Sequence, residues 1–471
     1  MASYHIYYYL SLILVVVLPV IYYLKTREGA SFGVIFPAFY FIYSFVAPLA
    51  VIHGDKFENV SRSFYIWDEI YPISDEPYVY LGHTYYLIFY LLWFAAFLLG
   101  RGRTDSSQSG GLIPVDKIRF DQRLFPRMPL LFFVTAFLAL VFYWILYSKF
   151  GSLVAGGISV YAAKITREPE YQFSTMDKGI FSLWGSALLC LWTVVLLHLK
   201  RGEVRRKLFV TTLAMFMLGL YVIAGFVIGD RSQLIIPLIG IFVVFTSVYK
   251  NINILSFKFL SLAAAAIILN FIIKSFRGDD PTQLFSLLLT EEKVTWFNMV
   301  AAVLFSVESF AAYTGMPFLI AKEIPPLYGE SLIYIVLSFV PRIIAPFRIT
   351  GTYSYSQYAT YAGIADSERG FTFHYVADWY FNFWFFGIVV GGILTGLLMG
   401  VVERKAKHSR RSVFWIAAFA MLCGAIPSHL RSPIEGIRAV FFEYWSLPFL
   451  FFVLVPMAKG RLLRWKQQQN M

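Results

Sequence analysis

Two neighbouring apolar runs in residues 208–249 decide the class of fold. Residues 208–228 read LFVTTLAMFMLGLYVIAGFVI, the turn Gly229-Asp230-Arg231-Ser232 follows, and residues 233–249 read QLIIPLIGIFVVFTSVY. Neither run contains a charged residue, and each is long enough to cross a hydrocarbon core of roughly 30 Å as an α-helix. The stretch therefore predicts a pair of membrane helices joined by a minimal turn.

The rest of the chain carries the same signal. Of its 471 residues, 58% are hydrophobic and only 14% are charged, and the mean hydropathy is +0.65. Soluble domains contain about a quarter charged residues, so this composition excludes a disordered chain, collagen, a disulfide scaffold and a nucleic-acid-binding protein. We predict an all-α polytopic membrane protein with about 11 transmembrane helices and a large outer loop containing interfacial or re-entrant helices. The predicted spans are residues 5–24, 31–53, 80–100, 128–148, 179–199, 208–228, 233–249, 255–275, 380–402, 412–429 and 437–457.

The basic residues predict how these helices are oriented. Lys and Arg gather in alternate loops, which the bias of such residues places on the cytoplasmic side, and a net charge of +12 is what such loops would give. We expect the first run to be a retained helix rather than a signal peptide, because it lacks a basic leader and a cleavage site. The outer loops are then residues 54–79, 149–178, 229–232, 276–379 and 430–436. Three segments follow: 1–275 with helices 1–8, 276–379 as a large periplasmic loop, and 380–471 with helices 9–11 and a cytoplasmic tail.

The sequence contains no nucleotide or metal signature. No Walker motif, dinucleotide fingerprint or zinc spacing occurs, so we expect no cofactor and no metal. His374 and Asp378 share one helix face, but two ligands are weak support for a metal, and a hydrogen bond at the interface is the preferred interpretation. Cys190 and Cys423 both lie inside apolar runs, which indicates packing rather than disulfide formation.

Several arginines lie at the predicted outer boundary, although the orientation bias favours arginine on the cytoplasmic side. Their guanidinium forks suit bidentate contact with phosphate, so a cluster of them could hold a diphosphate. The alternative is that each one extends toward lipid headgroups or pairs with a nearby acid such as Asp230 or Glu435. The arginines in question are Arg231, Arg277, Arg342, Arg348, Arg431 and Arg438.

Acids and tyrosines complete the predicted outer site. Asp378 precedes the ninth span and Glu308 interrupts an apolar stretch; either carboxylate could act as a general base toward a sugar hydroxyl. For Asp378 the alternative is stabilisation by negative charge at a helix N-terminus. The strip from Gly351 to Gly363 contains Tyr353, Tyr355, Tyr358 and Tyr361. Such a strip suits sugar binding or a membrane-interface aromatic belt.

Four short stretches in residues 220–457 resemble the O-antigen and oligosaccharide repeat-unit polymerases of the Wzy type, including the enterobacterial common antigen polymerase. The first is Ile228-Gly-Asp-Arg231 with its following aliphatic span. The second is Leu327-Tyr-Gly-Glu-Ser-Leu-Ile-Tyr, continued by Pro341-Arg342 and Arg348. The third runs from His374 to Gly387, with Asp378 in place of the commoner Glu, and the fourth is the last outer turn with Arg431 and Arg438.

The resemblance implies a membrane glycosyltransferase that polymerises undecaprenyl-diphosphate-linked oligosaccharide repeat units at the periplasmic face of the bacterial inner membrane, in O-antigen and lipopolysaccharide biosynthesis. Expected partners are this lipid-linked oligosaccharide and membrane lipid, with a chain-length regulator and a flippase as candidates, and no nucleic acid. Asp378, Arg231 and Arg431 would be catalytic. Diphosphate would be bound by Arg231, Arg277, Arg342, Arg431 and Arg438, and sugar by Arg348, His374, Tyr353, Tyr355 and Tyr358. An O-antigen ligase or another lipid-linked-sugar glycosyltransferase is one alternative, and a flippase or transporter of lipid-linked oligosaccharide is another.

Overall fold

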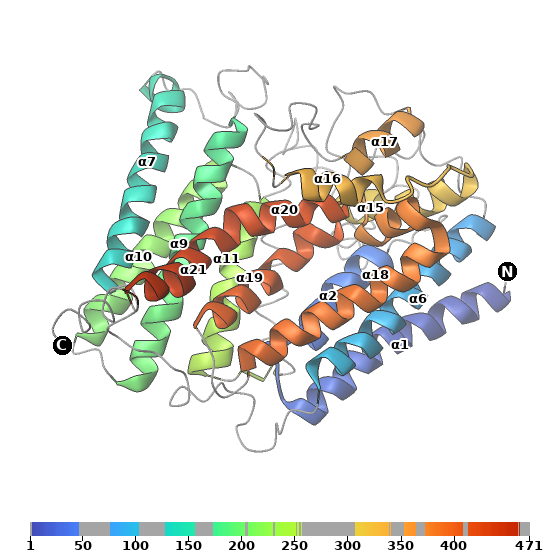
Figure 1. Ribbon diagram of the computed structural model, residues 1–471, viewed down its shortest axis with the longest axis horizontal. Helices are drawn as coiled ribbons and strands as arrows, with labels where there is room; N and C mark the ends of the chain where they lie inside the picture. Colours follow the sequence, from blue (N-terminus) through green and yellow to red (C-terminus); the bar gives the residue numbers. More distant parts are fainter. Residues whose placement is uncertain are drawn as a thin grey trace, which may run out of the picture.

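The computed structural model is a bundle of helices (Figure 1). It describes residues 2–46, 76–102, 128–155, 173–202, 206–228, 231–250, 252–253, 256, 307–338, 340, 353–363, 373–407, 413–459 and 461. Every regular element within these residues is helical, in agreement with the predicted fold class. The α-helices are α1 (Ala2–Thr26), α2 (Phe32–Ser44), α6 (Glu76–Arg101), α7 (Met128–Ala155), α9 (Thr175–Arg201), α10 (Lys207–Ile228), α11 (Arg231–Val244), α15 (Val307–Ala321), α16 (Glu330–Ser338), α17 (Tyr353–Tyr361), α18 (Tyr375–Lys407), α19 (Val413–Leu430), α20 (Ile437–Ala439) and α21 (Ser446–Phe449). Three short π-helices are η5 (Phe245–Tyr249), η7 (Val440–Trp445) and η8 (Leu450–Leu454), and η6 (Ile434–Gly436) is a 3₁₀-helix.

Eight stretches of helix in the described residues are long and apolar enough to cross a membrane. The multi-pass membrane prediction is therefore confirmed. Two further predicted spans correspond to the shorter apolar helices Phe32–Ser44 and Gln233–Tyr249. The predicted span 255–275 lies outside the described residues apart from Ser256, so the count of about 11 stays a prediction.

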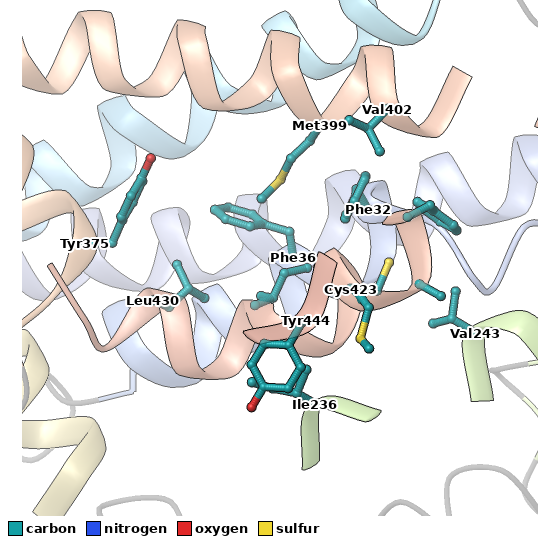
Figure 2. Packing of buried hydrophobic residues seen from close by; sticks show 14 of the residues in the cluster. Phe32, Phe36, Ile236, Val243, Tyr375, Met399, Val402, Cys423, Leu430 and Tyr444 are labelled. Atoms are coloured by element: carbon teal, nitrogen blue, oxygen red, sulfur yellow. The ribbon is translucent and has the colours of Figure 1, made fainter. Parts of the chain in front are cut away.

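Helix α19 packs between α11, α18 and α2 in the middle of the bundle (Figure 1). Its Gly424 lies so close to α11 that an added Cβ would be 2.0 Å from the Ile236 carbonyl oxygen. Figure 2 shows the side chains that meet around this helix: Phe32, Phe36, Ile236, Val243, Tyr375, Met399, Val402, Cys423, Leu430 and Tyr444. Cys190 and Cys423 are both fully buried, as their apolar surroundings predict.

A stripe of glycines joins α18 to α6. A Cβ at Gly392, Gly396 or Gly400 would lie 3.0, 2.3 or 2.4 Å from carbonyl oxygens of α6. Small residues at this spacing let two membrane helices approach to backbone contact. The successive partners on α6 also advance along the chain, so the two helices run parallel. Arg101 and Lys407 therefore lie at one end of the bundle and Tyr375 at the other.

Four buried charged side chains lie together at the end of the bundle that contains Arg101 and Lys407. Glu403 is fully buried and accepts hydrogen bonds from the backbone N–H of Phe32 (2.7 Å) and from Lys407 Nζ (2.9 Å), with Arg101 Nε 3.2 Å away. Glu28 pairs with Arg101 Nη2 at 2.7 Å and with Lys407 Nζ at 2.8 Å. Burial alone would raise the pKa of Glu28, but the two cations outweigh burial and lower it. We call Glu28, Arg101, Glu403 and Lys407 the charge network; it lies at the end that the orientation bias predicts to be cytoplasmic.

Candidate functional site

The opposite end is built around an interruption of α18. Phe383 (φ −144°, ψ 22°) and Trp384 (φ 51°, ψ −141°) are not helical, and they separate the segment 375–382 from the rest of the helix. The carbonyl oxygen of Phe381 accepts a hydrogen bond of 2.8 Å from the Leu327 N–H, in the loop between α15 and α16. Positive φ at a tryptophan costs on the order of 1–3 kcal/mol and is typical of functional sites. The interruption places the segment before α16 against the beginning of α18.

Asp378 lies in the short segment before the interruption and is fully buried. Its Oδ1 accepts a hydrogen bond from Asn382 Nδ2 at 3.1 Å, and its Oδ2 accepts one from the backbone N–H of Ile434 at 2.6 Å. A buried carboxylate needs such donors, because an unpaired one would lose its hydration without compensation. Asp378 thus holds the turn η6, which follows α19.

Glu435, the next residue of that turn, binds α17. Its carboxylate accepts hydrogen bonds from the backbone N–H groups of Tyr353 (2.5 Å) and Ser354 (3.1 Å) and from Ser354 Oγ (3.2 Å). The first N–H groups of a helix have no carbonyl partner within the helix. A carboxylate there also opposes the positive end of the helix dipole. Glu435 is therefore the N-terminal cap of a helix that begins 82 residues earlier in the chain.

Helix α16 connects these contacts into a closed chain of hydrogen bonds. Ser331 Oγ donates to Asn382 Oδ1 at 2.9 Å, and the Tyr353 hydroxyl donates to Glu330. The hydrogen bond to Glu330 and partial burial raise the pKa of Tyr353 to about 12. We call the set Glu330, Ser331, Asp378, Asn382, Glu435, Tyr353 and Ser354 the carboxylate circuit. It joins α16, α18, η6 and α17, of which Figure 1 labels α16 and α17 near each other at the upper right.

Two of the predicted arginines flank the turn that Asp378 holds. Arg431 follows α19 and Arg438 lies in α20, and both are partly exposed. Arg231 is the first residue of α11, which runs antiparallel to α19: Gly424 meets Ile236, and Gly240 meets Ala420. The backbone of Arg231 therefore lies at the same end as Arg431. The side chains of Arg231 and Glu308, and all of Arg277, Arg342 and Arg348, lie outside the described residues.

The predicted sugar-binding residues separate by exposure. Tyr358 is only 2% exposed and packs between Phe318 and Phe373, with ring centroids 5.5 and 4.6 Å away. Its ring anchors α17 rather than facing a ligand. Tyr353 and Tyr355 are partly exposed, and Tyr361, at 48% exposure, is the more accessible ring of this helix.

His374 likewise points into the protein. It is fully buried, with Nε2 2.9 Å from Ser44 Oγ and Nδ1 accepting from the Val376 N–H at 3.1 Å. Burial lowers the pKa of His374 to about 3, so the ring is neutral. This geometry favours a structural role over sugar binding. Within the described residues, no group of three or more His, Cys, Asp or Glu side chains could hold a metal ion.

Several residues of the circuit were not predicted as functional from the sequence. The sequence suggests Glu435 only as an ion-pair partner for an arginine, and Asn382 and Ser331 only lie inside the stretches that resemble the polymerase family. The local signal for Glu435 is an acid two residues after Pro433 in a predicted outer turn, which does not identify the helix it caps. Comparisons with family models, curated proteins and solved structures found no match to this chain.

Proposed function

We propose that the protein is a membrane glycosyltransferase that polymerises lipid-diphosphate-linked oligosaccharide repeat units at its outer face, in the manner of O-antigen polymerases. The observation that supports this proposal most is the carboxylate circuit. It gathers, around buried Asp378, both the turn flanked by Arg431 and Arg438 and the tyrosine-bearing helix α17. Cations suited to a diphosphate and rings suited to a sugar are thereby held at one end of the bundle.

The proposed reaction transfers a glycan between two lipid carriers. A hydroxyl oxygen of the acceptor sugar attacks the anomeric carbon of the donor, the bond from that carbon to the diphosphate oxygen breaks, and the hydroxyl proton leaves to a base. Arg431 and Arg438 stabilise the negative charge that develops on the departing diphosphate. No nucleotide is required, because the lipid diphosphate is itself the leaving group.

The role of Asp378 in this proposal is chiefly to orient the arginine-bearing turn. The carboxylate is fully buried and both of its oxygens already accept hydrogen bonds. To act as the general base, it would have to exchange the Ile434 N–H for the acceptor hydroxyl. Asp378→Asn should therefore reduce transfer whether the carboxylate orients the turn or acts as the base. Only if Asp378 is the base should the substitution also remove the pH dependence of turnover.

The proposal is tested by elongation of lipid-linked oligosaccharide in membranes that carry single-arginine variants. Arg431→Ala and Arg438→Ala should each reduce chain elongation at least tenfold. Arg404→Ala, which removes an exposed arginine at the opposite end, should leave elongation unchanged and serves as the matched control. Wild-type elongation in both outer variants would refute the diphosphate role.

A flippase of lipid-linked oligosaccharide is the second candidate, because interrupted membrane helices line the substrate sites of many transporters. The interruption of α18 is the observation that favours it. The charge network argues against it, since a two-sided pathway between α1, α2, α6 and α18 would have to separate buried ion pairs. Transbilayer movement of lipid-linked oligosaccharide in proteoliposomes, without chain elongation, would favour the flippase. An O-antigen ligase shares the donor, and only the accepted acceptor distinguishes it.

A further inference from the structure

The turn η6 contacts two separate parts of the outer site through consecutive residues. The N–H of Ile434 binds Asp378 on α18, and the carboxylate of Glu435 binds the N-terminus of α17. Arg438 follows Glu435 by three residues. One short turn therefore fixes the distance between the arginines and the tyrosine-bearing helix.

Helix α17 depends on a few contacts for its position. It has nine residues and a mostly polar sequence, YSYSQYATY. An isolated helix of this length is not stable in water, so its order must come from its neighbours. They include Glu435 at its N-terminus, Glu330 on the Tyr353 hydroxyl, and the pocket of Phe318 and Phe373 around Tyr358. The rings of Tyr334 and Phe381 also contact it, at centroid distances of 4.4 Å from Tyr353 and 6.3 Å from Tyr361.

The remaining face of α17 is exposed. Ser356, Thr360 and Tyr361 are exposed, and Tyr361 has 48% of its surface accessible. Hydroxyls beside an aromatic ring match the polar edges and apolar faces of a saccharide. The face lies on the helix whose first N–H groups are bonded to the arginine-bearing turn.

We propose that Glu435 is a positioning residue that holds α17 in register with the arginine-bearing turn, so that an acceptor saccharide on α17 lies against a diphosphate at Arg431 and Arg438. The proposal rests on the proposed glycosyltransferase function. Glu435 acts through the backbone of Tyr353 and Ser354 and needs no contact with the reacting atoms.

The capping role predicts a graded response to substitution. Glu435→Gln keeps one carbonyl oxygen that can accept from Tyr353 or Ser354, whereas Glu435→Ala keeps none. Hydrogen exchange should therefore accelerate at these two amides by at least tenfold in Glu435→Ala and by less in Glu435→Gln. Glu323→Gln, at an exposed acid outside the circuit, is the matched control and should exchange like the wild type. Unchanged exchange at residues 353–354 in Glu435→Ala would overturn the positioning role.

Kinetics with lipid-linked oligosaccharide extracted from the source cells test the functional half of the proposal. Glu435→Ala should raise the KM for the acceptor about tenfold and change kcat less than twofold, and Glu435→Gln should fall between it and the wild type. A loss of kcat that is equal in the Gln and Ala variants would instead identify a catalytic acid or base and overturn the proposal. If the exchange data agree but the wild-type protein elongates no chain, α17 is positioned as described and the glycosyltransferase function is what fails.

Discussion

Substitution of Glu403 by Gln gives the sharpest test of how the bundle is held together. Glu403 is fully buried and is the shared partner of Lys407 Nζ (2.9 Å), Arg101 Nε (3.2 Å) and the Phe32 N–H (2.7 Å). Gln has nearly the same shape and keeps one oxygen that can accept from Phe32. It cannot compensate the cations, so Lys407 and Arg101 are left with Glu28 as the single anion of the network.

The expected cost follows from that uncompensated charge. Breaking a buried ion pair by removing one partner costs about 3–5 kcal/mol. The two side chains of Lys407 and Arg101 are only 8% and 7% exposed, so water relieves little of this cost. A second substitution, Lys407→Met, removes the surplus cation and leaves Arg101 paired with Glu28. The double variant should recover about 0.5–3 kcal/mol of the loss, which is the usual coupling between contacting groups.

The measurement is equilibrium unfolding of the purified protein in mixed micelles of increasing SDS content, followed by tryptophan fluorescence. The set comprises the wild type, both single variants, the double variant, and Glu323→Gln as an exposed control. The control should unfold with the wild type. The reasoning is refuted if Glu403→Gln is as stable as the wild type, or if the double variant is no more stable than the single one.

Two further predictions concern packing and pH. Gly396→Ala should destabilise the protein by about 1–3 kcal/mol or more, because the new Cβ would lie 2.3 Å from the Trp93 carbonyl oxygen. Gly219→Ala is the control: an added Cβ there meets nothing within 4 Å, so this variant should not be destabilised in the same assay. His374 has a pKa of about 3 in the folded protein and about 6.5 when unfolded. Between these values the unfolded state binds more protons, so stability should fall as the pH is lowered, by up to about 1.4 kcal/mol per unit. Acid titration of His374→Gln should show a shallower fall than the wild type, and equal slopes would contradict the assignment.

The sequence predicts the helices better than their interruptions. Uniformly apolar runs identify the long spans because membrane length and hydropathy leave few alternatives. The predicted span 31–53 includes α2, whose helix ends at Ser44, and the predicted span 380–402 begins inside α18. The break at Phe383 and Trp384 leaves no mark in the sequence, since aromatic residues continue through it. The long-range contact beside it, from the Leu327 N–H to the Phe381 carbonyl oxygen, is not indicated by the sequence either.

The site shows the same division between local and long-range information. The sequence proposes Asp378 and Arg431 as site residues because ionisable groups at membrane depth are costly and arginines are biased away from the outer side. Glu435 could not be assigned as the cap of α17, because the two are separated by 82 residues and no local pattern relates them. Likewise, the sequence explains Arg101 and Lys407 as orientation signals. It does not identify their shared partner Glu28, which lies far from both of them in the sequence.

The glycine stripe between α6 and α18 has a consequence for synthesis. Gly400 contacts Phe97, and about 300 residues of chain separate them. At ~5–20 residues per second, α6 waits on the order of 15–60 s in the bilayer before α18 is made. During that time Arg101 also lacks Glu403, its later partner. Nascent α6 therefore depends on insertion factors until α18 is made, and ribosomes stalled before residue 373 should present it to the cell's membrane quality control with its α18-facing side uncovered.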